Sequence, residues 1–254
     1  MIPKKLHYAW FGGDKPQYLV DNLKSWKKFL PDYEIIEWNN ENWDVNKYLF
    51  SKYHYDQKKY GFVTDPLRVD VLRQYGGIYI DSDVTITQSL DRFLNSPLFL
   101  GMHFTNAIGT ALIGAEKNNP VMVDLDEFYK NITFEDLQDE SFDKVNNGIF
   151  TRYMIEKYPE FKMVNRTQKL NDGLMIYPKQ YFVLPALVHK HNFAIHANEG
   201  SWNSSNTVNT KKNNNVIKKM GRVILGPTLL SWRSNQKQME KNSLYQLYLE
   251  RGKK

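Results

Sequence analysis

Cysteine is absent from the 254-residue sequence. Without thiols the chain cannot form a disulfide framework or a metal site built on thiolates, which excludes the small secreted domains that disulfides hold together. The absence of cysteine fits a reducing compartment.

The sequence also lacks long hydrophobic runs. Residues 1–10, MIPKKLHYAW, have no apolar core of the kind found in signal peptides, and no stretch approaches the length needed to span a bilayer. We therefore predict a cytoplasmic protein.

The composition is that of a globular domain rich in aromatic residues. Hydrophobic residues make up 41% and charged residues 24%, which is ordinary, whereas aromatic residues reach 14%, with sixteen Tyr and six Trp. Flat rings can stack on sugars or bases, although most of them are expected to fill the core. The length allows one large domain, or one domain with a small helical addition.

Positive charge is concentrated at the C-terminal end. Residues 211–254 contain eleven Lys or Arg against Glu240 and Glu250, a net charge of +9; since the whole chain carries +6, residues 1–210 carry −3. Such a basic extension can face anionic lipid, a phosphorylated acceptor, nucleic acid or only solvent.

The N-terminal part has the pattern of an α/β unit. Residues 2–10 predict a strand, apolar residues at helical spacing predict a helix over 19–30, and residues 33–38 predict a second strand. Strand, helix and strand in this order favour a parallel sheet. Residues 39–60 are polar and aromatic, so irregular or short helical structure is expected there.

The next predicted helix leads into a short strand. It is expected to begin at Asp65 and Pro66, because Asp is a good N-cap and Pro is favoured in the first turn. Gly76 and Gly77 are expected to end it. The apolar residues 78–80 then predict a buried strand, and open α/β sheets bind ligands beyond the C-terminal ends of such strands.

The remaining sequence predicts further elements of both kinds. We expect strands at 97–102 and 110–115, helices at 120–130 and 148–158, extended segments at 173–184 and 192–202, and a marginal amphipathic helix at 239–251.

Two carboxylates follow the predicted short strand. In an extended backbone residues i and i+2 point the same way, so Asp81 and Asp83 are expected to converge while Ser82 points away. No Lys or Arg lies between Arg73 and Arg92, so the pair would repel unless a cation were bound. A divalent ion that takes oxygen ligands, Mn²⁺ or Mg²⁺, meets this requirement.

Three functions are compatible with this acidic pair. A metal held there would neutralise the diphosphate that leaves a nucleotide sugar, which is glycosyl transfer. Alternatively, Asp81 is a nucleophile and Asp83 its acid/base partner, because DSDVT also fits the signature of haloacid-dehalogenase-type phosphatases. That alternative requires a second acidic motif after an apolar strand, and we find none. A non-catalytic carbohydrate-binding protein that uses its Trp and Tyr rings would need neither carboxylate.

Three ordered stretches together resemble a known family. They are IPKKLHYAWFGG at 2–13, FVTDPLRVDVLRQYGGIYIDSDV at 62–84 and AIHANEGSW at 194–202. This combination resembles the glycosyltransferases that carry a DXD sugar-binding region, which include bacterial capsular and polysaccharide transferases and fungal initiating mannosyltransferases. The large clostridial glucosylating toxins are more distant relatives.

The resemblance implies a fold and a cofactor. It implies a GT-A-type, Rossmann-like α/β domain that binds a nucleotide sugar, with helical additions, and an Mn²⁺ or Mg²⁺ ion. We place this domain at residues 1–210, followed by the basic extension at 211–254 with its amphipathic helix.

The resemblance also implies roles for individual residues. Trp10 would stack on the nucleobase, and Asp65 and Arg68 would contact the donor sugar and the ribose region. Asp83 would bind the metal directly, and Asp81 would contact ribose and the metal's water shell. Asp65, Arg68, Asp81 and Asp83 are thus the predicted catalytic residues. Further predicted contacts to the nucleotide sugar are Tyr79, Ser82 and Asn147.

A C-terminal segment is expected to close over the diphosphate. His196 is the candidate third metal ligand, with Asn198 and Glu199 as competing ligands, and Ser201 and Trp202 would donate to phosphate oxygens. The family's commoner form has two consecutive histidines, whereas here alanine follows His196.

The predicted function is metal-dependent, retaining transfer of a hexose from a nucleotide sugar, with a UDP-sugar as first choice. The expected acceptor is a polysaccharide, an oligosaccharide or a lipid-linked glycan, as in the synthesis of capsule or cell-surface glycan. Under this interpretation the basic extension contacts the anionic inner face of the membrane, and nucleic acid is not a partner.

Overall fold

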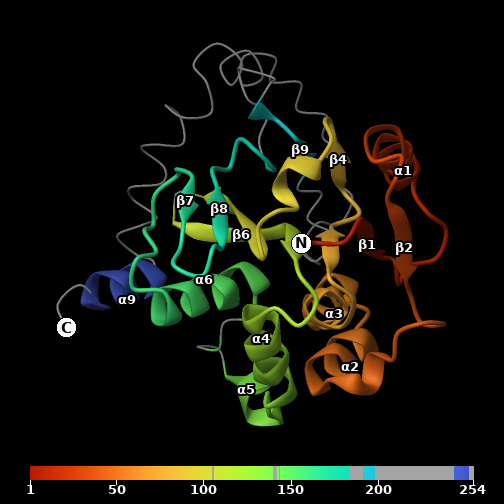
Figure 1. Ribbon diagram of the computed structural model, residues 1–254. Coiled ribbons are helices and arrows are strands. Elements are labelled where there is room, and N and C mark those ends of the chain that lie inside the picture. Colours follow the sequence, from red (N-terminus) through yellow and green to blue (C-terminus); the bar gives the residue numbers. More distant parts are fainter. Residues whose placement is uncertain (105, 140–141, 143, 184–190, 198–242, 252–254) are drawn as a thin grey trace, which may run out of the picture.

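A computed structural model describes residues 1–104, 106–139, 142, 144–183, 191–197 and 243–251. It contains a seven-stranded sheet in the order β2-β1-β3-β6-β5-β8-β7 and a two-stranded sheet of β4 and β9 (Figure 1). The strands are β1 (Lys5–Ala9), β2 (Glu34–Trp38), β3 (Gly77–Ile80), β4 (Val84–Ile86), β5 (Leu98–Phe104), β6 (Ala107–Ala115), β7 (Gln168–Lys169), β8 (Met175–Tyr177) and β9 (Ala194–His196).

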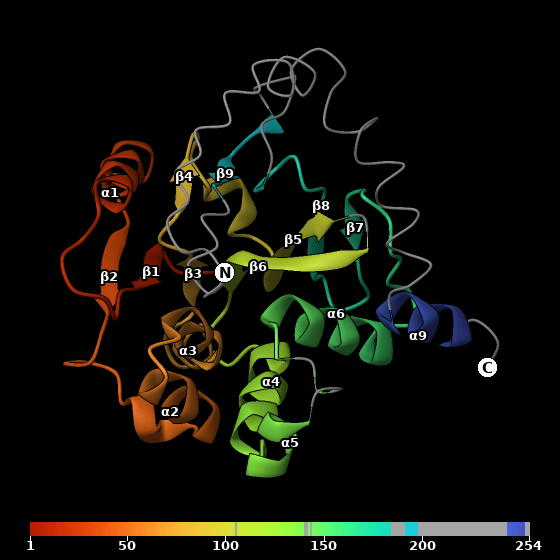
Figure 2. The same ribbon diagram turned by 180° about the vertical axis from the view of Figure 1, so that it is seen from behind.

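Helices cover both faces of the large sheet, so the predicted α/β class is confirmed. α3, α4 and α6 lie on one face, and α1 lies with the β4–β9 pair on the other (Figures 1 and 2). A separate cluster of buried apolar side chains fills the space on each side. The helices are α1 (Gln17–Phe29), α2 (Leu49–Asp56), α3 (Tyr60–Tyr75), α4 (Pro120–Lys130), α5 (Phe134–Gln138), α6 (Asn146–Lys157) and α9 (Ser243–Arg251), with short 3₁₀ turns at Val45–Lys47 and Asp91–Phe93. None of the described helices has the length and apolar character to cross a membrane.

The parallel sheet predicted from the N-terminal pattern is confirmed for only part of the molecule. β1 pairs in parallel with both β2 and β3, and β5 pairs in parallel with β8. β6, however, runs antiparallel to both β3 and β5. Only residues 105–106 separate β5 from β6, which is too short for a crossover, so this pair has to be a hairpin.

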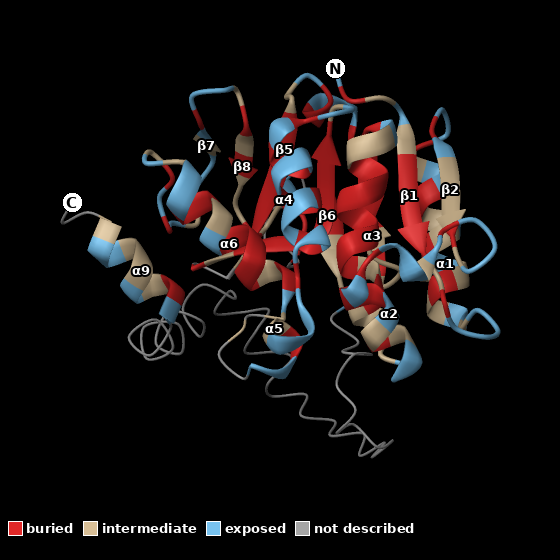
Figure 3. Ribbon diagram, turned by 90° about the horizontal axis from the view of Figure 1, so that it is seen from below, coloured by how far each residue is buried: buried red, intermediate tan, exposed pale blue. Residues whose placement is uncertain are grey.

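α3 begins six residues earlier than predicted. It starts at Tyr60, so Asp65 is not its N-cap and Pro66 lies inside the helix. A proline there removes one helical hydrogen bond. α3 continues through it because its residues 65–72 are all buried, and Figure 3 draws much of α3 in the colour of buried residues. The predicted end is confirmed: Gly76 has a φ of 64°, and a Cβ there would lie 2.7 Å from the Lys117 nitrogen.

The C-terminal helix packs against the domain. The described part of the predicted 239–251 helix is α9, which lies beside α6 (Figure 2) and buries Leu244. The guanidinium of Arg251 donates to the carbonyls of Ile155, Tyr158 and Phe161 at 2.7–3.0 Å. α9 therefore caps the C-terminal end of α6. The predicted domain boundary at residue 210 lies outside the described residues.

Candidate active site

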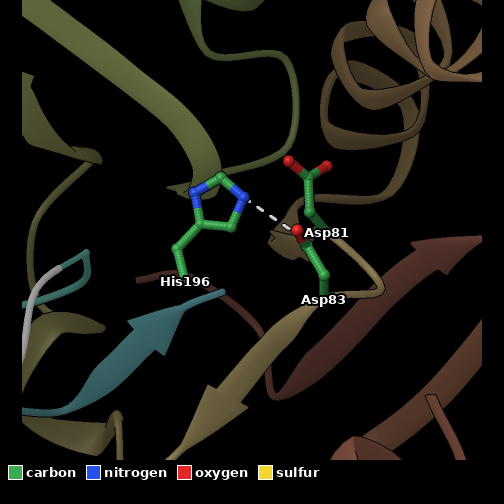
Figure 4. Close-up of side chains that lie close together, drawn as sticks. All are labelled: Asp81, Asp83 and His196. Carbon is green, nitrogen blue, oxygen red and sulfur yellow. Dashed lines mark ion pairs between the residues drawn. The ribbon is translucent and has the colours of Figure 1, made fainter. Parts of the chain in front are cut away.

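A turn, rather than an extended strand, brings the two carboxylates together. β3 ends at Ile80, and the Val84 amide donates to the Asp81 carbonyl at 3.1 Å before β4 begins. The extended backbone that we predicted for this stretch is therefore wrong. Asp81 and Asp83 nevertheless converge with His196, and one ligand atom from each lies within 4.8 Å of the others (Figure 4).

His196 reaches the acidic pair through the small sheet. β9 pairs antiparallel with β4, and Val84 is the register partner of His196. This pairing puts His196 Nε2 3.1 Å from Asp83 Oδ1, while the Ala197 amide donates to the Asp83 carbonyl at 3.0 Å. Burial lowers the pKa of His196, whereas the hydrogen bond to Asp83 raises it. The net shift of the pKa is upward.

The three side chains fit a divalent metal ion. Two carboxylates and one imidazole give a compact donor set with a net negative charge, and carboxylates are the ligands that Mn²⁺ and Mg²⁺ prefer. Within the described residues this is the one cluster of at least three acidic or histidine side chains with metal-binding spacing. The competing ligands Asn198 and Glu199 lie outside the described residues.

A cation from α3 lies beside this cluster. Arg68 Nη2 lies 2.9 Å from Asp65 Oδ1 and 3.4 Å from Asp81 Oδ1, and its side chain is 5% exposed. The prediction that no basic side chain compensates the acidic pair is therefore wrong for Asp81. The sequence between Arg73 and Arg92 holds no basic residue, but the helix before β3 supplies the charge.

Burial dominates the acid–base properties of these groups. It raises the pKa of Asp81, against the opposing effect of Arg68. It also raises the pKa of Asp65 to about 7, although Arg68 lowers it and a backbone hydrogen bond from Asn146 stabilises the carboxylate. Asp65, predicted as a helix cap for α3, thus receives the first N–H of another helix, α6.

All described residues that the sequence predicted for the site line one cavity of about 340 Å³. The nine residues are Trp10, Asp65, Arg68, Tyr79, Asp81, Ser82, Asp83, Asn147 and His196. The predicted phosphate contacts Ser201 and Trp202 lie outside the described residues.

Several of these residues are held in place by further contacts. Trp10, directly after β1, donates from Nε1 to the Gly13 carbonyl at 2.9 Å. The Arg68 guanidinium lies 4.8 Å from the centre of the Tyr79 ring. The Ser82 carbonyl accepts from Asn22 on α1 at 2.9 Å, which holds the turn between the carboxylates against that helix.

The sequence interpretation missed other residues that line the cavity. His103 on β5 has its ring 6.0 Å from that of His196, next to a register shift between Met102 and Phe104. Such irregularities re-aim side chains, but no residue pattern marked this one in the sequence. The other missed side chains include Phe11, Tyr18, Tyr60, Phe62, Thr64, Thr110 and Asn146.

A family comparison bears on the same residues. Residues 16–100 match the model of the family described as "Glycosyltransferase sugar-binding region containing DXD motif". This stretch of the chain is similar to the DXD sugar-binding region of that family. The match includes Asp65, Arg68, Asp81 and Asp83, whereas Trp10 and His196 lie outside it.

Curated relatives of the chain include proteins of two yeasts and of a virus. Over 128 residues the chain is 30% identical to inositol phosphoceramide mannosyltransferase 3 of Schizosaccharomyces pombe, covering 48% of this chain and 35% of the relative. It is 29% identical to a mannosyl phosphorylinositol ceramide synthase of Saccharomyces cerevisiae, covering 52% and 37%. An uncharacterized glycosyltransferase of Acanthamoeba polyphaga mimivirus is 25% identical, covering 70% and 74%. The chain thus spans about a third of the length of the two yeast relatives.

Solved structures of glycosyltransferases are also similar to this chain. The PaToxG glycosyltransferase aligns with a TM-score of 0.48 and 16% identity, covering 62% of this chain and 70% of that one. A glycosyltransferase involved in glycosylation of the major capsid of PBCV-1 aligns with a TM-score of 0.41 and 9% identity, covering 76% and 93%.

Proposed function

We propose that this protein is a metal-dependent glycosyltransferase that moves a hexose from a nucleotide sugar to a glycan or lipid-linked glycan. The observation that carries the proposal is the convergence of Asp81, Asp83 and His196 in a cavity whose wall includes Trp10 and the Arg68 guanidinium. The DXD family match supports the reaction class.

Different site residues would bind different parts of the donor. Asp83 and His196, with Asp81 beside them, would hold Mn²⁺ or Mg²⁺. Bound there, the ion would neutralise charge on the departing diphosphate. The Trp10 ring offers a face for the nucleobase. Arg68, fixed by its ion pair with Asp65, adds a positive charge beside the acidic centre.

The proposal extends to the donor and the acceptor. We propose a UDP-sugar as donor, with retention of configuration, for capsule or other cell-surface glycan. The yeast relatives are named for mannosyl transfer to an inositol phospholipid, so nucleotide-activated mannose is the second donor to test.

We further propose that residues 211–254 hold the enzyme at the anionic inner face of the membrane. The apolar side of α9 packs on α6, so the attraction would come from the basic charges rather than from insertion of α9.

The function is tested by measuring donor hydrolysis and transfer with Mn²⁺ across UDP-, GDP- and other nucleotide hexoses. We expect activity with one donor, its loss with a chelator, and a loss of at least a hundredfold in Asp83→Asn, on the order of what one electrostatic contact supplies. A folded Asp83→Asn protein with unchanged turnover would sink the proposal. Phosphate release from small phosphomonoesters, with a phosphoryl group trapped on Asp81, would support the phosphatase alternative instead.

A further inference from the structure

Asn146 lines the cavity although its side chain is almost fully buried. It is the first residue of α6, and it is 2% exposed. Its backbone N–H donates to the Asp65 carboxylate, and its side-chain Oδ1 accepts from the Tyr129 hydroxyl at 3.1 Å. These two bonds fix both the backbone and the amide plane of Asn146.

The side-chain nitrogen of Asn146 has no hydrogen-bond partner among the described residues. Buried amide donors in proteins are nearly always hydrogen bonded, so one without a partner requires an explanation. Since Asn146 belongs to the wall of the cavity, an oxygen of a bound ligand provides that explanation.

The neighbouring Asn147, which the sequence singled out, is occupied differently. Its Oδ1 accepts from both the amide and the hydroxyl of Thr110, at 3.0 and 2.7 Å. The Thr110 carbonyl in turn accepts a hydrogen bond from Arg68 Nη1 at 2.6 Å. Asn147 therefore fastens α6 to β6, and Asn146 is the better candidate for contact with a ligand.

The order of the strands indicates which part of the donor reaches Asn146. Trp10 follows β1, Asp81 follows β3, and Asn147 is tied to β6; these three strands are consecutive in the sheet. A donor with its base on Trp10 and its diphosphate at the Asp81–Asp83 centre would therefore point its sugar toward α6. Asp65, bonded to the Asn146 backbone, offers an acceptor next to the Asn146 donor. A donor and an acceptor side by side suit a hydroxyl group, which can use both.

Building on the proposed function, we propose that Asn146 is a specificity-determining residue whose side-chain NH₂ donates to a hydroxyl oxygen of the transferred sugar. Asp65 lies beside it as the acceptor for the same part of the sugar. Asn146 and Asp65 would thus form hydrogen bonds to the sugar, on a side of the cavity that the nucleotide does not contact.

Binding measured by titration calorimetry with Mn²⁺ tests this inference. The ligands are UDP-glucose, UDP-galactose, UDP-N-acetylglucosamine and GDP-mannose, then the monodeoxy forms of the donor that binds, and its nucleoside diphosphate. Wild-type protein should bind one monodeoxy donor about tenfold more weakly than the parent, which corresponds to one hydrogen bond. Asn146→Ala should lose most of this difference, with only the contribution of Asp65 remaining, and should bind the nucleoside diphosphate as wild type does.

Two further variants separate binding from folding. Asn146→Leu keeps most of the volume if the alanine variant fails to fold. Asn119→Ala removes another buried asparagine, which caps α4 through Val121 and lies outside the cavity. Asn119→Ala should lower the free energy of unfolding and keep the tenfold difference in affinity between the parent and the monodeoxy donor. The wild-type comparison of parent and monodeoxy donors stands without any variant.

The outcomes are distinguishable. If wild type binds every deoxy form as tightly as the parent donor, or if Asn146→Ala keeps the full tenfold discrimination, this inference is wrong while the proposed function stands. If Asn146→Ala loses as much affinity for the nucleoside diphosphate as for the sugar donor, the inference is also wrong. Wild-type protein that binds no nucleotide sugar contradicts the proposed function, and this inference with it.

Discussion

Arg68 Nη2 lies 3.4 Å from Asp81 Oδ1 and so joins the middle of α3 to the end of β3. The same nitrogen pairs with Asp65 at 2.9 Å. All three side chains line the cavity, which makes this chain of charges part of the site rather than of the outer surface.

Removal of the Arg68 charge should destabilise the protein. Arg68→Met leaves Asp65 buried without its cation, and the expected loss in the free energy of unfolding is about 3–5 kcal/mol, measured by urea denaturation. Lys52→Met is the control, because it breaks an exposed ion pair with Asp56 and should cost no more than about 0.5 kcal/mol. Equal losses in the two variants would contradict the role assigned to Arg68.

Manganese should stabilise the folded protein through the Asp81–Asp83–His196 cluster. At a free concentration one hundred times its Kd, a bound ion adds about 2.7 kcal/mol, visible as a rise in Tm. We expect Asp83→Asn and His196→Ala each to abolish most of this rise, whereas Asp56→Asn, which changes an exposed carboxylate, should keep it. A rise that persists in all three variants would place the ion elsewhere.

Acid should destabilise the protein through His7. Its Nε2–H donates to the Gly76 carbonyl at 2.8 Å and its Nδ1 accepts from Trp38 Nε1 at 3.1 Å, so the ring is held neutral. Burial lowers the pKa of His7 from 6.5 to about 4. The unfolded chain therefore takes up the proton first as pH falls, and stability is lost between pH 6.5 and about 4, by roughly 3 kcal/mol for this residue.

The measurement is the free energy of unfolding across that pH range. Burial also lowers the pKa values of His54 and His103, so they contribute to the loss in the same direction. His7→Gln should unfold more easily at pH 7 and show a shallower fall toward pH 4. A variant whose pH profile runs parallel to that of the wild type would refute the assignment.

The C-terminal helix should contribute to stability. Arg251→Ala removes three hydrogen bonds to carbonyls at and beyond the end of α6, and we expect a loss of about 1–3 kcal/mol by thermal or urea unfolding. Arg152→Ala, which removes an exposed pairing with Glu156 at 3.9 Å, serves as the control and should change little. If the two substitutions were equivalent, α9 would not be the cap that its contacts indicate.

Binding to anionic vesicles should depend on the basic extension. Changing Lys211, Lys212, Lys218 and Lys219 to Gln removes four positive charges, each worth about 1 kcal/mol near a phosphatidylserine-containing surface. The amount of variant protein that sediments with such vesicles should be far below that of the wild type. Neither protein should sediment with vesicles of phosphatidylcholine alone. This variant leaves the sequence of α9 unchanged, and its thermal unfolding should be compared with that of the wild type. Unchanged sedimentation would remove the proposed membrane contact.

The sequence predicted the elements whose signals are local. α4 has the predicted bounds Pro120–Lys130, because Asn119 caps it and proline suits its first turn. The start of α3 was wrong because tertiary burial outweighed the same local signals at Asp65 and Pro66.

The candidate site was predictable in its members but not in its contacts. Asp81 and Asp83 stand together in a recognisable motif. By contrast, the ion pair from Arg68 and the unpartnered amide of Asn146 depend on how α3 and α6 pack, which no short pattern encodes. The hydrogen bond between Thr110 and Asn147 could not be predicted either, because it depends on how α6 packs against β6.

The pairing of β4 with β9 has a consequence for the order in which the protein matures. His196 is 113 residues downstream of Asp83, so the full donor set exists only after the ribosome has released the chain beyond β9. A nascent chain that ends before Ala194 would carry the two carboxylates of the motif without their histidine. If a metal binds there as proposed, its full set of protein ligands would therefore form only after β9 has been made and has paired with β4.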